Sequence, residues 1–302
     1  MSNIKRAILC GLNYIGSDLQ LNGCINDATN MKQILIDHYG YKPNNIMLMT
    51  DYTAIKPTKQ NIMKYLQKLI NDAGKYCQLV FHYSGHGSYL KDQNNDEIDH
   101  KDECLVPLDY KKNGMIRDDD IKKIVQNLHP TAQLTMIIDA CHSGTMIDLK
   151  YQLDCLSVTQ NSRQMNTKKC NDNNDNKTIQ NNDNDDNNDN SNDNDEYIFK
   201  DWTYDYKLSE DSHYNFDTKC GKIISISGCR DNQTSADAYI NRTFQGALSY
   251  VFLTVLKLNG YKHIKLKYLL KDMHCILKIN NYEQKPVIQS SKPILLNSLF
   301  FL

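Results

Sequence analysis

A cysteine and a histidine in this sequence each follow an apolar run that is typical of a buried strand. The run at residues 134–138 is followed by Asp139, and Cys141 comes two positions later. A second run, at residues 79–81, leads into His86. A cysteine thiolate is a strong nucleophile, and a neighbouring imidazole can generate it by accepting the thiol proton. The two residues therefore predict covalent catalysis if their loops meet. The alternative is a buried thiol and a structural histidine.

The segments after both residues contain glycine, which lets the chain turn sharply. Backbone N–H groups in such turns can bind the oxyanion that forms when a nucleophile attacks a carbonyl group, and we expect those of Gly87 and Cys141 to do so. Two other imidazoles compete with His86 for the catalytic role. His82 lies inside the strand run and is expected to be structural, whereas His142 adjoins the thiol but points away from it if the turn is sharp.

Short apolar runs alternate with helical patterns along most of the chain. Strands are expected at 7–12, 46–49, 78–83, 104–107, 133–139 and 222–227, and the segment 285–302 is expected to add another. Helices are expected at 26–38, 58–70, 118–128, 245–258 and 264–279, with Thr58 and Asp118 as candidate N-caps. This alternation predicts an α/β fold with a mostly parallel central sheet and helices on both faces.

The pattern breaks in the middle of the chain, where residues 171–195 are mostly Asn and Asp. Such a tract cannot bury apolar surface, so we expect residues 157–200 to form a disordered insertion. The strand at 222–227 has no complete core without the first part of the chain. We therefore expect residues 1–156 to be a large catalytic segment and residues 201–302 to complete the same domain.

Composition argues against several classes of partner and cofactor. A net charge of −1 over 302 residues gives no general attraction to nucleic acid or acidic lipid. No apolar run has the roughly 18 residues of a membrane helix, and the first residues do not resemble a signal peptide. The ten cysteines are scattered without zinc-ligand spacing, so most are expected to be small buried hydrophobes. We expect a cytoplasmic protein without zinc, and without nucleic-acid or membrane partners.

The sequence around both candidate residues is similar to that of a known family. The motifs HYSGHGS (82–88) and DACHSGT (139–145) resemble the paired signatures of type I metacaspases, caspase-like cysteine peptidases of clan CD, family C14. Further similar segments follow in the same order, at 21–28, 102–109, 114–120 and 226–237. The resemblance spans roughly residues 5–151 and 220–258. It implies a caspase-like (caspase–hemoglobinase) fold, protein or peptide substrates and a monomeric enzyme.

The resemblance also implies cleavage after arginine or lysine, in a pocket formed by Cys24, Asp27 and Asp139. Two carboxylates suit this role because they can pair with a guanidinium or ammonium group. Taken alone, Asp27 could instead complement the positive end of a helix. An aspartate-specific pocket would need a basic residue here, and none is visible in the sequence.

A regulatory calcium ion, not required by the chemistry itself, is implied at Asp102, Asp118, Asp119 and Asp148. Calcium prefers several oxygen ligands, which clustered carboxylates supply. Without the resemblance, the acidic run at 118–120 would be typical of a solvated helix start.

Four basic residues in the expected insertion are candidate sites of self-cleavage: Arg163, Lys168, Lys169 and Lys177. Two alternatives to an active peptidase remain open at this point. The loop between His86 and Asp102 is short compared with the family, which would suit a catalytically weak pseudoenzyme. Such a chain could act as a calcium-responsive interaction module.

Overall fold

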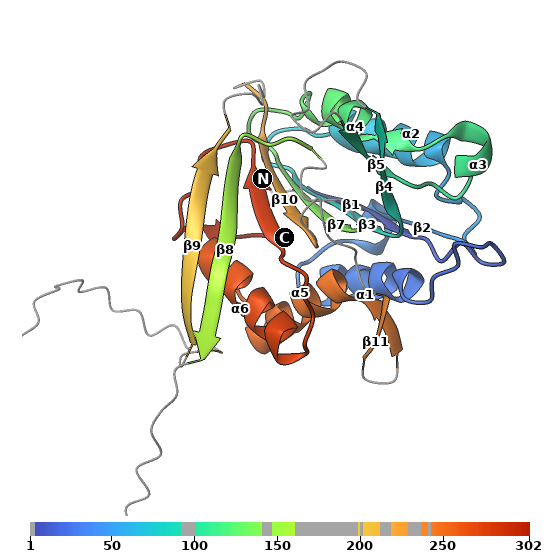
Figure 1. The fold of residues 1–302 in the computed structure, drawn as a ribbon. Helices are drawn as coiled ribbons and strands as arrows, with labels where there is room; N and C mark the ends of the chain where they lie inside the picture. The colour runs from blue at the N-terminus through green and yellow to red at the C-terminus, as the bar shows by residue number, and fades with distance from the viewer. Residues whose placement is uncertain are drawn as a thin grey trace, which may run out of the picture.

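The computed structural model describes residues 4–91, 101–140, 147–160, 199, 202–211, 219–228, 237–240 and 243–302. Its centre is an eight-stranded sheet in the order β2-β1-β3-β7-β10-β14-β8-β9 (Figure 1). These strands are β1 Lys5–Gly11, β2 Ile46–Thr50, β3 Gln78–Ser84, β7 Gln133–Asp139, β8 Tyr151–Gln160, β9 Trp202–Glu210, β10 Lys222–Ser227 and β14 Val287–Ser290. The strands from β2 to β10 in this order are parallel, and β14, β8 and β9 extend the sheet in antiparallel pairs. The predicted α/β class is confirmed.

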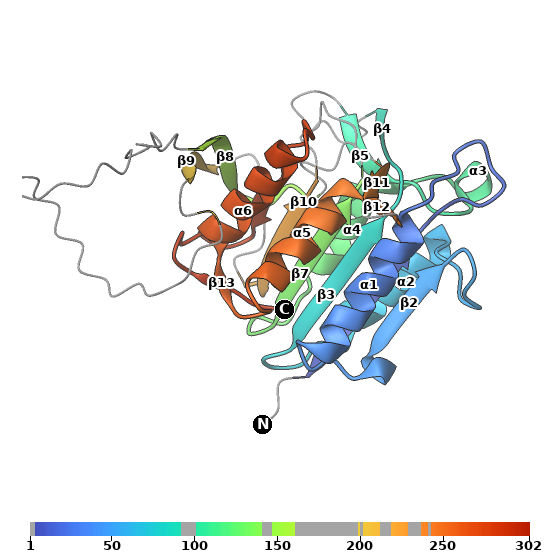
Figure 2. The ribbon, with the colours of Figure 1, turned by 90° about the horizontal axis from the view of Figure 1, so that it is seen from below.

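Helices cover both faces of this sheet and bury a separate core on each side. They are α1 Cys24–Asp37, α2 Lys59–Asn71, α3 Tyr110–Asn113, α4 Asp118–Val125, α5 Ala247–Leu258 and α6 Leu266–Ile279, with a 3-10 turn at Pro43–Asn45. Helices α1, α5 and α6 lie together on one face (Figure 2). Helices α2 and α4 contribute to the core on the other face. None of the helices in the described ranges is long and apolar enough to span a membrane.

The two predicted helix caps have different outcomes. Thr58 caps α2, because its side chain accepts a hydrogen bond from the Asn61 backbone N–H at 3.3 Å. The prediction for Asp118 is wrong, since α4 begins at this residue and Arg117 occupies the N-cap position. The Asp118 carboxylate is buried and accepts a hydrogen bond from the Glu103 backbone N–H at 3.1 Å. Tertiary contacts have therefore replaced the local capping role.

The described residues also form three small sheets beside the main one. They are β4 Gly87–Lys91 with β5 Lys101–Leu105 and β6 Ile116–Arg117, β11 Asp237–Ile240 with β12 Thr243–Gly246, and β13 Ile264–Lys265 with β15 Leu299–Phe300. Strand β4 begins immediately after His86, and β12 runs directly into α5. Both junctions lie next to predicted site residues, as shown below.

Strands from before and after residues 161–198 interleave in the far half of the main sheet. β8 lies between β14 and β9, and β10 lies between β7 and β14. β8 continues to Gln160, four residues into the range expected for the insertion. Residues 161–198 lie outside the described ranges.

Candidate active site

The predicted catalytic residues follow two neighbouring parallel strands of the main sheet. Ser84, the last residue of β3, is the direct register partner of Asp139, the last residue of β7. The Gly85 backbone N–H donates a hydrogen bond to the Asp139 carbonyl oxygen at 3.2 Å. His86 and Cys141 are each two positions beyond this pair. Cys141 itself lies outside the described residues, as does His142. The carboxyl end of such a sheet is the usual place for ligand binding in α/β folds.

The ring of His86 is held in one orientation. Its Nε2 atom lies 2.8 Å from the carbonyl oxygen of Leu19. A carbonyl oxygen can only accept, so this contact assigns the proton to Nε2 and leaves Nδ1 as the basic nitrogen. The ring also contacts that of Tyr14, with the two centroids 5.0 Å apart. The geometry therefore gives His86 the tautomer of a general base.

The backbone around His86 is fixed by two buried tyrosines. The Tyr14 hydroxyl accepts a hydrogen bond from the His86 N–H at 3.0 Å and donates one to the Val106 carbonyl at 2.6 Å. The Tyr83 hydroxyl donates to the His86 carbonyl oxygen at 3.0 Å. Gly87, the predicted oxyanion-binding residue, follows directly as the first residue of β4. The loop is thus anchored on both sides of the imidazole.

The structure brings Asp27 and Asp139 together beside this strand end. Asp27 lies in α1, and its Oδ2 atom accepts hydrogen bonds from Ser84 Oγ at 2.7 Å and from the Gly246 N–H at 2.9 Å. Asp139 Oδ2 accepts one from the Ser249 N–H at 2.7 Å. A Cβ atom added to Gly246 would clash with the Asp139 carboxylate and lie 3.0 Å from Asp27 Oδ2. Both carboxylates therefore converge on one glycine.

The remaining predicted pocket residue, Cys24, begins α1 one turn before Asp27, and its side chain is buried. The sequence alone did not predict a site role for Ser84, Gly246 or Ser249. Ser84 could have been suspected because it lies within the HYSGHGS motif. No signal in the sequence distinguishes the other two, since their contacts join segments more than 100 residues apart.

His82 behaves as a structural residue, as its place within β3 predicts. Its Nε2 atom lies 3.4 Å from the Ser249 hydroxyl, and the side chain is fully buried. Burial disfavours the charged imidazolium and lowers its pKa to about 3. This histidine is therefore neutral at physiological pH.

The four predicted calcium ligands lie close to one another near the start of α4. The pKa of Asp118 is raised to about 8 by burial and by the negative charges of Asp148, Asp102 and Asp119. A hydrogen bond from the Asp119 N–H opposes this shift. Arg117 forms an ion pair with Asp102, and Lys122 Nζ lies 3.4 Å from Asp148 Oδ2. Within the described ranges, no three His, Cys, Asp or Glu side chains form a group arranged to hold a metal ion. The donor chemistry suits a hard cation, but two side-chain cations compete for the same carboxylates.

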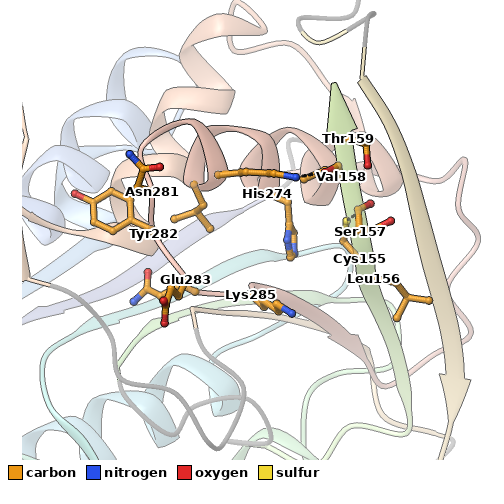
Figure 3. A pocket seen from close by; sticks show the side chains of 13 residues that line it. Cys155, Leu156, Ser157, Val158, Thr159, His274, Asn281, Tyr282, Glu283 and Lys285 are labelled. Carbon is orange, nitrogen blue, oxygen red and sulfur yellow. Dashed lines mark hydrogen bonds between the residues drawn. The ribbon is translucent and has the colours of Figure 1, made fainter. Parts of the chain in front are cut away.

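A separate cavity of about 810 Å³ lies between β8 and the end of α6 (Figure 3). Lys278 Nζ donates a hydrogen bond to the Val158 carbonyl at 2.6 Å, and His274 Nε2 lies 2.9 Å from the Pro286 carbonyl oxygen. These groups attach α6 to its neighbours. The described residues of the predicted catalytic, pocket and calcium sets do not line this cavity.

Comparison with known proteins decides the family. Residues 5–150 match the family model for the metacaspase, peptidase C14 domain. Metacaspase-1 of Scheffersomyces stipitis is 36% identical over 305 residues, which cover 100% of this chain and 74% of that protein. The chain belongs to the metacaspase family. Metacaspase-1 of Schizosaccharomyces pombe is 34% identical over 97% of this chain and 68% of its own length. This metacaspase is accordingly a cysteine peptidase acting on proteins or peptides.

A solved structure shares the fold of this metacaspase. A crystal structure of a Geobacter sulfurreducens protein matches with a TM-score of 0.60, covering 98% of this chain and 97% of that chain. The two sequences are 20% identical, so this likeness concerns the fold alone.

The Tyr14 hydroxyl should stabilise the loop that carries His86. Replacing Tyr14 with phenylalanine removes its contacts to His86 N and Val106 O, so the free energy of unfolding should fall by about 1–3 kcal/mol. Urea denaturation measures this change. Tyr76→Phe is the matched control, because Tyr76 is 60% exposed. Equal losses in the two variants would contradict the anchoring role.

Proposed function

We propose that this metacaspase is an endopeptidase that cleaves after arginine or lysine, with Cys141 as nucleophile and His86 as general base. The observation that carries the proposal is the register pairing of Ser84 with Asp139, since both proposed catalytic residues lie two positions beyond this pair. Parallel neighbouring strands deliver their following loops to the same edge of the sheet.

In the proposed mechanism, His86 Nδ1 accepts the proton of the Cys141 thiol. The thiolate attacks the peptide carbonyl carbon, and the backbone N–H groups of Gly87 and Cys141 stabilise the oxyanion. The imidazolium then protonates the leaving amine as the C–N bond breaks. His86 next deprotonates a water molecule that attacks the thioester, which releases the carboxylate product and restores the thiol. The contact between His86 Nε2 and the Leu19 carbonyl oxygen supports these proton transfers, because it leaves Nδ1 without a proton.

The preference for basic side chains is supported by the two buried carboxylates of Asp27 and Asp139. A guanidinium group pairs strongly with carboxylates when both are shielded from water. Cys24 is proposed to line the same pocket, because it lies in the same helix as Asp27.

Replacing His86 with glutamine should reduce kcat/KM for an arginyl fluorogenic peptide by about 10²–10⁴-fold, because it removes the proposed general base. The wild-type protein should cut arginyl and lysyl peptides, and leave the corresponding aspartyl peptide intact. His263→Gln provides a control at an exposed histidine. An uncut arginyl peptide in the wild-type sample would favour the pseudoenzyme alternative.

We further propose that calcium binds at Asp102, Asp118, Asp119 and Asp148 and regulates activity. The proposal is supported by the grouping of these carboxylates around the start of α4. Calcium would replace the side chains of Arg117 and Lys122 at two of them and favour a different arrangement of the surrounding loops.

Calcium should raise the thermal midpoint of the wild-type protein and its rate of peptide cleavage, and a chelator should reverse both effects. Asp118→Asn should abolish both responses. Asp37→Asn changes an exposed carboxylate of α1 and should leave them intact. Equal responses in the two variants would exclude this site.

Self-cleavage is proposed at one or more of Arg163, Lys168, Lys169 and Lys177, which lie outside the described residues. Intact-mass spectrometry of the calcium-treated protein should find fragments that end at these positions. Cys141→Ala should remain a single chain. Active wild-type protein that stays intact would show that cleavage there is not part of its function.

A further inference from the structure

The first turn of α5 contacts both carboxylates of the proposed basic pocket. Gly246, at the N-cap position, donates its N–H to Asp27 Oδ2 at 2.9 Å, and Ser249 donates its N–H to Asp139 Oδ2 at 2.7 Å. The N–H groups at a helix start have no partner within the helix and carry partial positive charge. This 12-residue helix has no side-chain cap, so the two aspartates take the place of one.

Two carboxylates buried side by side repel one another and lose their hydration, which favours protonation of at least one. Hydrogen bonds from backbone N–H groups oppose this, because they stabilise the charged form. They do so without adding a cationic side chain that would compete with the substrate's own cation. The start of α5 is therefore suited to keep Asp27 and Asp139 ionised and correctly spaced for a guanidinium group.

The identity of residue 246 supports the same conclusion. Gly246 has φ −69° and ψ 139°, a conformation that every residue can adopt. Its backbone therefore does not require glycine. A Cβ atom at this position would instead clash with the Asp139 carboxylate and crowd that of Asp27. Glycine is needed here because the two carboxylates approach this backbone so closely.

A second contact fixes the helix turn relative to the sheet. The Ser249 hydroxyl lies 3.4 Å from Nε2 of the buried His82 in β3, the strand that also carries Ser84. Ser84 in turn donates to Asp27 at 2.7 Å. The two aspartates, β3 and α5 thus belong to one connected set of contacts.

We infer that Gly246 and Ser249 are positioning residues for the preference for basic substrates. Their backbone N–H groups hold the carboxylates of Asp27 and Asp139 in place. This inference rests on the proposed cleavage after arginine or lysine. It gives the C-terminal part of the chain a share in specificity, although the proposed nucleophile, the base and both pocket carboxylates lie in the N-terminal part.

The test compares an arginyl peptide with its citrullinyl analogue, which has nearly the same shape but no charge. In Gly246→Ala, kcat/KM for the arginyl peptide should fall at least about 30-fold, while that for the citrullinyl peptide changes little. The alkylation rate of Cys141 by iodoacetamide should match the wild type. A merely structural role would lower both peptide rates together.

Gly74→Ala is the matched control, because a Cβ at Gly74 would meet no atom within 4 Å. Ser249→Pro is a second route, since it removes the N–H that donates to Asp139, and Ser249→Ala controls for the loss of the hydroxyl near His82. Ser249→Pro should produce the same selective loss. A folded Gly246→Ala or Ser249→Pro protein that keeps the wild-type preference for arginine over citrulline overturns the inference. Failure of the proposed function would instead appear as wild-type protein that does not cut the arginyl peptide.

Discussion

The parallel register of β3 and β7 is the constraint on which the rest of the site depends. It makes Ser84 and Asp139 direct partners at the end of the sheet, so the chain leaves both strands at the same level. One loop then carries His86 and the other leads to Cys141. The hydrogen bond from Gly85 to the Asp139 carbonyl continues the pairing past the last strand residues. A shift of one residue would separate the two loops and turn their side chains to opposite faces of the sheet.

Buried carboxylates are stabilised in two different ways in this protein. Near α4, the side chains of Arg117 and Lys122 neutralise Asp102 and Asp148. Beside β7, backbone N–H groups from the start of α5 contact Asp27 and Asp139. A flexible cationic side chain can be displaced by another cation, whereas a helix backbone cannot leave without unfolding. The ion pairs near α4 therefore suit exchange of one cation for another. The backbone contacts beside β7 suit a site that is kept ready to bind a cationic side chain.

The sequence predicted the elements whose signals are local. Strands β7 and β10 have the predicted bounds because each is a nearly continuous buried run, and Thr58 caps α2 as expected. β8 and β9 escaped prediction for physical reasons. A bulge between Cys155 and Ser157 interrupts the alternation of β8, and most side chains of β9 are exposed at the sheet edge. The motifs indicated His86 and Asp139, but the contacts of Gly246 and Ser249 depend on tertiary folding and leave no local pattern.

Because β8, β9, β10 and β14 interleave in one sheet, it matters whether a break in the chain between β8 and β9 occurs before or after folding. Strands that precede residues 161–198 and strands that follow them interleave in one sheet, so each part of the chain leaves strand edges that the other part must pair with. The covalent link keeps the partner strands at a high effective concentration while the sheet assembles. Once assembly is complete, the ladder hydrogen bonds and the shared cores hold the two parts together without it. A break in the link would therefore hinder folding of a newly made chain, whereas in a folded molecule the paired strands would still hold the two parts together.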